Sequence, residues 1–167
     1  DTAAKVTQNE VLKGSVAVSG TSRADGVLVE SGFGTVVDAT QRPLAPVRLL
    51  PAPDLSAIQK LHERVLVRLR LTPLAGAAKY RAVLSRDAAF NTILREEVLA
   101  SPEARYADLP DGDYYFRLRG IDGSGLEGLE AVNSFRLKAR PEPPFLSTPA
   151  NRGKLRALSA EFSWSSA

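Results

Sequence analysis

The feature that most constrains the fold is an alternation of apolar and charged residues with a period of two. Residues 65–71 are VLVRLRL, residues 114–119 are YYFRLR and residues 134–138 are SFRLK. Side chains of a β-strand point alternately to its two faces, so each segment predicts a strand with one apolar and one charged face. Antiparallel sheets with a core on one side and water on the other have this pattern. The sequence therefore predicts an all-β fold.

Composition excludes several classes of function. The 167 residues include no cysteine, which excludes thiol catalysis and Cys-based zinc sites, and only one histidine, His62. No set of nucleophile, base and oxyanion donors is recognisable, so we expect no enzyme activity and no cofactor. Asp108, Asp111 and Asp113 lack the spacing of a calcium loop, and we interpret them as turn residues.

The charge and hydropathy of the chain give little reason to expect nucleic acid or membrane partners. The formal net charge is only +3, which is too small to argue for nucleic acid binding. No stretch approaches the roughly 18 apolar residues that span a bilayer. Methionine is absent even at position 1, so we expect that the native start lies upstream.

Residues 74–135 carry four short motifs in succession. They are LAGAAKYR at 74–81, SRDAAF at 85–90, LPDGDYYFRLRGID at 109–122, and GLEG at 125–128 followed by Ser134-Phe135. Together they resemble strands C to G of bacterial fibronectin type III-like modules. The resemblance implies a seven-stranded antiparallel sandwich with a core tyrosine, Tyr114, whose hydroxyl bonds to the backbone of the nearby turn.

The flanks resemble parts of other β modules. Residues 11–18 and 27–37, two short runs rich in valine and glycine, resemble the last strands of a FecR-like domain. Residues 161–164, EFSW, resemble strand B of a further fibronectin-like module, in which Trp164 would belong to the core.

Proline-rich stretches mark the borders between these parts. We predict the C-terminal part of a FecR-like domain at 1–42, a Pro-rich linker at 43–64, the sandwich at 65–140 with its first strand near 47–50, and the truncated start of a second similar module at 141–167. Within the linker, residues 54–64 predict a loop with one helical turn.

The alternation also predicts a basic surface. Strands C, F and G share a sheet in this fold, so their outward residues would lie together. Arginine and tyrosine together suit anionic polymers and sugars, but we favour the interpretation as a solvated sheet face whose arginines cover Tyr115 and its neighbours. The predicted face comprises Arg81, Tyr115, Arg117, Arg119, Arg136 and Lys138.

The resemblances imply a setting in the bacterial periplasm or cell envelope. We expect a non-catalytic interaction or spacer module of an envelope-anchored protein that senses or scaffolds. The alternative is direct binding of an anionic glycan, such as peptidoglycan, through the basic face. The expected partner is thus a protein or a cell-wall glycan, with no nucleic acid and no direct membrane insertion by this fragment. Unpaired flanking strands also predict a dimer.

Overall fold

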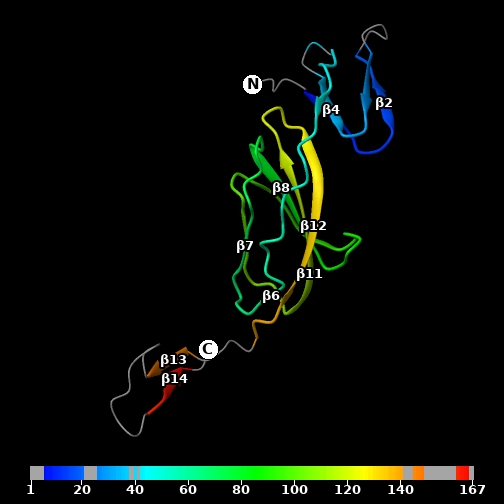
Figure 1. Ribbon diagram of the computed structural model, residues 1–167. Coiled ribbons are helices and arrows are strands. Elements are labelled where there is room, and N and C mark those ends of the chain that lie inside the picture. Colours follow the sequence, from blue (N-terminus) through cyan, green and yellow to red (C-terminus); the bar gives the residue numbers. More distant parts are fainter. Residues whose placement is uncertain are drawn as a thin grey trace.

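The computed structural model describes residues 6–20, 26–37, 40, 42–140, 145–148 and 161–165, whose regular elements are all β-strands. Figure 1 shows the N-terminal strands at one end, strands β6 to β12 in the middle and the hairpin of β13 and β14 at the other end. In the described part of the chain, there is no helix that could span a membrane.

Seven strands form a sandwich of two sheets. One sheet pairs β7 (Val67–Arg70) with β10 (Glu103–Tyr106). The other has the order β6-β12-β11-β8-β9, with all pairs antiparallel except β6 with β12. Its members are β6 (Leu61–His62), β8 (Lys79–Ser85), β9 (Ile93–Leu99), β11 (Gly112–Ile121) and β12 (Glu127–Leu137). This strand order confirms the predicted fibronectin type III-like sandwich.

The period-two pattern places the core where it was predicted. On β7, Val67 and Leu69 are buried between the two sheets. Arg68 and Arg70, which alternate with them, are exposed. On β11 the same alternation completely buries Tyr114, Phe116 and Leu118. The residues that follow each of them, Tyr115, Arg117 and Arg119, lie on the outer face. Full burial of an apolar side chain contributes about 1.5–3 kcal/mol.

Tyr114 is a core residue whose hydroxyl bonds to the backbone of the nearby turn, as the resemblance implied. Its hydroxyl donates a hydrogen bond to the carbonyl of Pro110, four residues upstream. Its ring stacks on Phe135 with centroids 5.4 Å apart, and the Arg86 guanidinium lies 4.2 Å from its centroid. One residue therefore joins the turn before β11 to the core.

The first strand of the sandwich does not lie near 47–50. A strand does form there, β5 (Val47–Arg48), but it pairs with β4 (Phe33–Val37) of the N-terminal part. The edge beside β12 is instead covered by the chain from Leu50 onward and then by β6. Pro51 and Pro53 have no N–H to give to a ladder, which delays regular pairing until β6.

The predicted helical turn in residues 54–64 is a single tight turn. Ile58 N donates to Leu55 O at 3.2 Å, and both side chains are buried against the sandwich core. A segment this short gains too few hydrogen bonds to continue as a helix. Burial of its two apolar side chains therefore decides its conformation.

The N-terminal strands form two small sheets. β1 (Thr7–Val11) pairs with β4, and β5 extends that sheet to three strands. β2 (Ser15–Val18) and β3 (Val27–Glu30) form a separate hairpin. Gly32, with φ of 82°, makes the tight turn between β3 and β4.

The C-terminal strands form an isolated hairpin among the described residues. β13 (Phe145–Thr148) pairs with β14 (Ser163–Ser165). Trp164 was predicted to be a core residue, but 64% of it is exposed. Two strands offer only one layer, so this side chain has no opposing sheet to pack against. Most of the predicted second module, including 149–160, lies outside the described residues.

We expect Tyr114 to be a principal contributor to stability. Tyr114→Ala should lower the free energy of unfolding by about 3–5 kcal/mol, because it empties a fully buried aromatic site. Tyr114→Phe keeps the ring packing and loses only the hydrogen bond, so it should lower this free energy by about 1 kcal/mol. Urea denaturation measures both. Equal losses for the two variants would contradict the assigned role of the ring.

Candidate binding face

The outer face of the larger sheet brings most of the predicted binding residues together. Arg81 lies on β8, and Tyr115, Arg117 and Arg119 lie on β11. In the register, Arg119 is opposite Arg81 on one side and opposite Glu130 of β12 on the other. The predicted outward orientation is thus found in the structure.

At one end of this face each arginine meets a carboxylate. Arg119 lies 2.9 Å from Glu130 and 3.8 Å from Glu127, and Arg117 lies 3.9 Å from Glu130. Arg81 donates to Glu127 through Nε and to Glu96 at 2.9 Å. The hydrogen bond that Arg81 donates to Glu127 is the main cause that raises the pKa of Arg81. Three arginines and three glutamates therefore form one charge-neutral network.

At the other end Arg136 is also paired. Its guanidinium makes two parallel hydrogen bonds to Asp113, at 2.7 and 2.8 Å. This pairing lowers the pKa of the Asp113 carboxyl. A hollow of about 170 Å³ lies beside the pair, lined partly by Tyr115 and Lys60. Lys60 donates to the side chain of Asn133.

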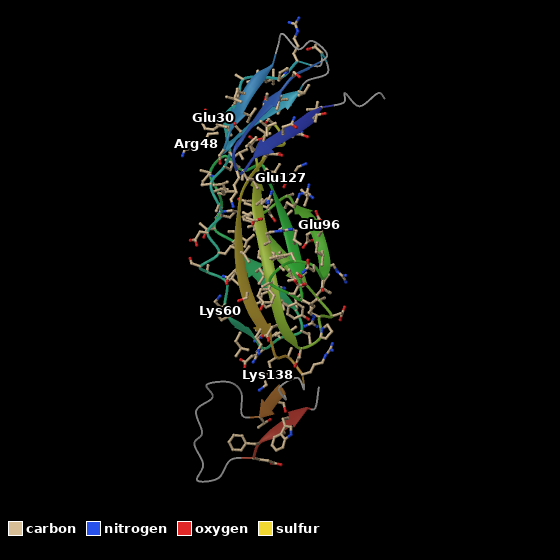
Figure 2. The ribbon with its side chains drawn as sticks, turned by 90° about the vertical axis from the view of Figure 1, so that its right-hand side faces the viewer. Glu30, Arg48, Lys60, Glu96, Glu127 and Lys138 are labelled. Carbon is tan, nitrogen blue, oxygen red and sulfur yellow. The ribbon has the colours of Figure 1, made fainter. Side chains whose placement is uncertain are left out.

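Lys138 is separate from the first cluster. It follows the end of β12 and is exposed, and its backbone N donates to the carbonyl of His62. Figure 2 shows Glu127 and Lys138 at opposite ends of the sandwich. They are eleven positions apart along an extended chain, which corresponds to roughly 35 Å. The predicted face is thus two locally neutralised clusters with a lysine beyond them, and no continuous cationic surface.

Sequence reasoning missed the carboxylates of this face. They are Asp113, Glu96, Glu127 and Glu130. The turn at residues 122–125 alone did not carry this signal, because Ile121 is opposite Glu127 beside it, and a register shift between Arg119 and Ile121 is needed to place Glu130 opposite Arg119 and Asp113 opposite Arg136. Pairs of this kind on an exposed sheet contribute little to stability, because water and salt screen them. Their main effect is to remove net charge from the surface.

His62 has no catalytic surroundings. Its ring meets Phe135 edge-on with centroids 5.1 Å apart, and Nε2 is buried without a hydrogen-bond partner. Burial lowers its pKa, which favours the neutral ring. Among the described residues, no three His, Asp or Glu side chains lie close enough to hold a metal ion.

The aspartates of the turns bind the backbone. Asp111 accepts hydrogen bonds from the N–H groups of Ala139 and Arg140, at 2.9 and 3.2 Å. Asp122 accepts from the N–H groups of Ser124 and Leu126, at 2.8 and 3.0 Å. These contacts agree with the turn interpretation of Asp111. For Asp113 that interpretation was wrong, because this residue lies on β11 and its side chain pairs with Arg136 across the sheet.

Asp87 organises the turn between β8 and β9 in the same way. Its carboxylate accepts hydrogen bonds from the N–H groups of Ala89, Asn91 and Thr92, at 3.1, 3.1 and 2.7 Å. Phe90 follows with a φ of 57°, and its ring lies under the guanidinium of Arg117 at 4.6 Å. The aspartate and phenylalanine of the SRDAAF motif are therefore explained by turn structure.

Comparison with known proteins gives a fold-level likeness only. No protein-family model matches the chain, and no curated protein matches it. Among solved structures, a similar chain is described as an Fn3-like protein from Clostridium thermocellum. It is 17% identical, with a TM-score of 0.37, and the match covers 53% of this chain and 85% of that chain. The function must therefore be argued from the geometry of this chain.

The Asp87 turn makes stability depend on acidity. Hydrogen bonds from the backbone of Asn91 and then Thr92 lower the pKa of Asp87 from its ordinary 3.8. A carboxyl whose pKa is depressed by folding stabilises the fold above its unfolded pKa and loses this contribution as the pH falls through its folded pKa. Asp87→Ala should therefore lower the Tm at pH 7, and its difference from wild type should shrink below pH 3.8. Thermal unfolding followed by circular dichroism between pH 2 and 7 measures this difference in Tm. If Asp87 had a purely steric role, the difference would not depend on pH.

Proposed function

We propose that this chain is a non-catalytic spacer and interaction module that holds neighbouring β modules in a fixed orientation. The observation that carries the proposal is a shared junction between the N-terminal strands and the sandwich. A small apolar core forms there from Val36 of the N-terminal part, Leu126 of the sandwich and Leu49 of the segment that connects them. Modules that share buried side chains move as one body more readily than modules joined by a bare linker.

Hydrogen bonds reinforce this core from both sides. Leu49 N donates to the carbonyl of Gly32 in the N-terminal part, at 2.9 Å. One residue on, the carbonyl of Leu50 accepts from Leu129 N of the sandwich, at 2.9 Å. Glu127 N donates to the carboxylate of Glu10 at 3.1 Å. The connecting segment is thus bonded to both modules within two consecutive residues.

Close packing supports the same conclusion. A Cβ on Gly128 would lie 2.6 Å from the Leu50 carbonyl oxygen, and one on Gly34 would lie 2.9 Å from a Leu49 methyl group. Only glycine fits beside the Leu50 backbone, whereas at Gly34 the Leu49 side chain would have to shift. The GLEG motif at 125–128 therefore contributes its leucine, a backbone N–H and a glycine to the junction. Figure 2 shows Glu127 at the end of the sandwich that faces the N-terminal strands.

The proposal includes a setting in the bacterial periplasm or cell envelope. It is supported by the likeness of residues 11–18 and 27–37 to the last strands of FecR-like domains, and the absence of cysteine is compatible with it. The chain would then separate and orient partners within an envelope-anchored sensing or scaffolding protein. Fractionation of producing cells, followed by immunodetection of the full-length protein, tests the compartment.

Distance measurements test the rigid junction. The chain has no native cysteine, so Glu30→Cys and Arg95→Cys allow spin labels on exposed positions of the two parts. We expect a single narrow distance distribution, which Leu126→Asp should broaden because it buries a charge in the junction. Leu129→Asp is the matched control, since Leu129 lies three residues further along the chain, on β12, and its side chain is exposed. A broad distribution in the unmodified junction would overturn the spacer proposal.

The paired arginines make the anionic-glycan alternative less favoured. We expect purified cell-wall sacculi to retain wild type and the Arg117→Glu/Arg119→Glu variant equally, because both arginines are already neutralised by glutamates. A sedimentation assay at low ionic strength measures retention. Strong retention of wild type that the variant loses would restore glycan binding as the function.

A further inference from the structure

The smaller sheet of the sandwich has an open edge on β7. Leu71 N donates to the carbonyl of Pro102 at 2.9 Å, on the side of β10. Hydrogen-bonded pairs alternate along an antiparallel ladder, so Leu69 and Val67 also bond toward β10. The backbone N–H and C=O groups of Arg68 and Arg70 therefore point away from β10. No described residue forms a backbone hydrogen bond with them.

A groove lies along this edge. It has a volume of about 620 Å³, and its walls come from β6 with its preceding turn on one side and β7 with its preceding bend on the other. Two leucines in it are unusually exposed, Leu61 at 47% and Leu66 at 40%. The buried Ile58 also lines it. The groove exists because β6 pairs with β12 of the other sheet, which leaves the position beside β7 without a strand.

The groove and the sheet next to it are cationic. Arg64, Arg68 and Arg70 line the groove, whose only acidic lining residue is Glu63. Arg68 is directly opposite Arg105 of β10, a cross-strand pair of like charges. The carboxylate near these arginines belongs to Glu103, which accepts a hydrogen bond from Arg105 at 2.8 Å. No ion pair within 4.0 Å involves the three groove arginines in the described part of the chain.

We propose that the β7 edge is a docking site for an extended acidic peptide segment, which adds to the smaller sheet as a further strand. Its backbone would pair with the free N–H and C=O groups of Arg68 and Arg70. Its outward side chains would lie beside the arginines, and its inward side chains would cover Leu61 and Leu66. The site therefore selects a segment in which acidic and apolar residues alternate.

This partner site is independent of the junction between modules. β7 contacts β10, whereas the junction is formed by β4, β12 and the segment at 49–50. Loss of the spacer geometry would leave the docking site in place, and the two proposals are tested by different measurements. An acidic strand would also place carboxylates beside Arg68 and offset its repulsion with Arg105, which gives a physical reason for binding beyond the pairing of backbone groups.

Binding to synthetic peptides tests the proposal on the full chain. The probe is a fluorescein-labelled octapeptide of alternating glutamate and valine, titrated with the protein and followed by fluorescence anisotropy. We expect saturable binding that weakens at least tenfold in Arg68→Glu/Arg70→Glu. Arg95→Glu, on the edge strand β9 of the other sheet, is the matched control and should leave the affinity unchanged. Circular dichroism confirms that each variant is folded.

Two further probes separate strand addition from simple charge attraction on the unmodified protein. An octapeptide with lysine in place of glutamate, and the glutamate peptide with N-methyl groups on alternate backbone nitrogens, should each bind at least tenfold more weakly. Equal affinity for the N-methylated peptide, or no binding of the glutamate peptide, would overturn the proposal. Light scattering of the protein alone tests whether a second copy of this chain occupies the edge. A dimer that dissociates in Arg68→Glu/Arg70→Glu would assign the edge to that second copy and overturn the proposal.

Discussion

The central strand β11 carries the constraint on which the rest of the structure depends. Tyr114, Phe116 and Leu118 are completely buried on one side of it, and each is followed by a residue that must reach solvent on the other. A shift of one residue in pairing would move the apolar set to water and the arginines into the core. The register with β8 and β12 is therefore fixed by burial, and the positions of all outer-face residues follow from it.

This constraint explains why the fold and the orientation of the face could be predicted while its chemistry could not. Whether Arg117 and Arg119 point outward depends only on the pattern within one strand. Whether they are free to bind anions depends on which residues lie opposite them, and that depends on pairing between strands. Glu130 lies opposite Arg119 only because of a register shift between Arg119 and Ile121, and Glu96 reaches Arg81 from β9 beyond another register shift, between Leu84 and Ser85. Neither contact is encoded in a local pattern.

The Pro-rich segment was predicted as a linker, and the structure gives its residues several local roles. Pro51 and Pro53 prevent regular pairing, and Asn133 on β12 donates its side-chain amide to the Leu55 carbonyl at 2.7 Å. The segment thus lies along β12 by side-chain and isolated backbone contacts until β6 begins. Sequence patterns report repeated pairing, so a segment held by single, irregular contacts gives no recognisable signal. For the same reason the sequence did not indicate that β7 would keep an open edge.

Among the described residues, the arginines are paired with carboxylates on the outer face of the larger sheet but not at the edge of the smaller sheet. This difference bears on where a partner would bind. On the larger sheet the arginines of β8 and β11 are matched by glutamates, so an approaching anion gains little after it displaces an existing partner. On the smaller sheet Arg68 lies opposite another arginine, and the adjacent backbone groups have no strand beside them. Arginine side chains without an ion pair and backbone groups without a hydrogen-bond partner in the described part of the chain therefore occur together at the β7 edge. A ligand that satisfies both must be a polypeptide with carboxylates on one face, which a polysaccharide or a free anion cannot imitate.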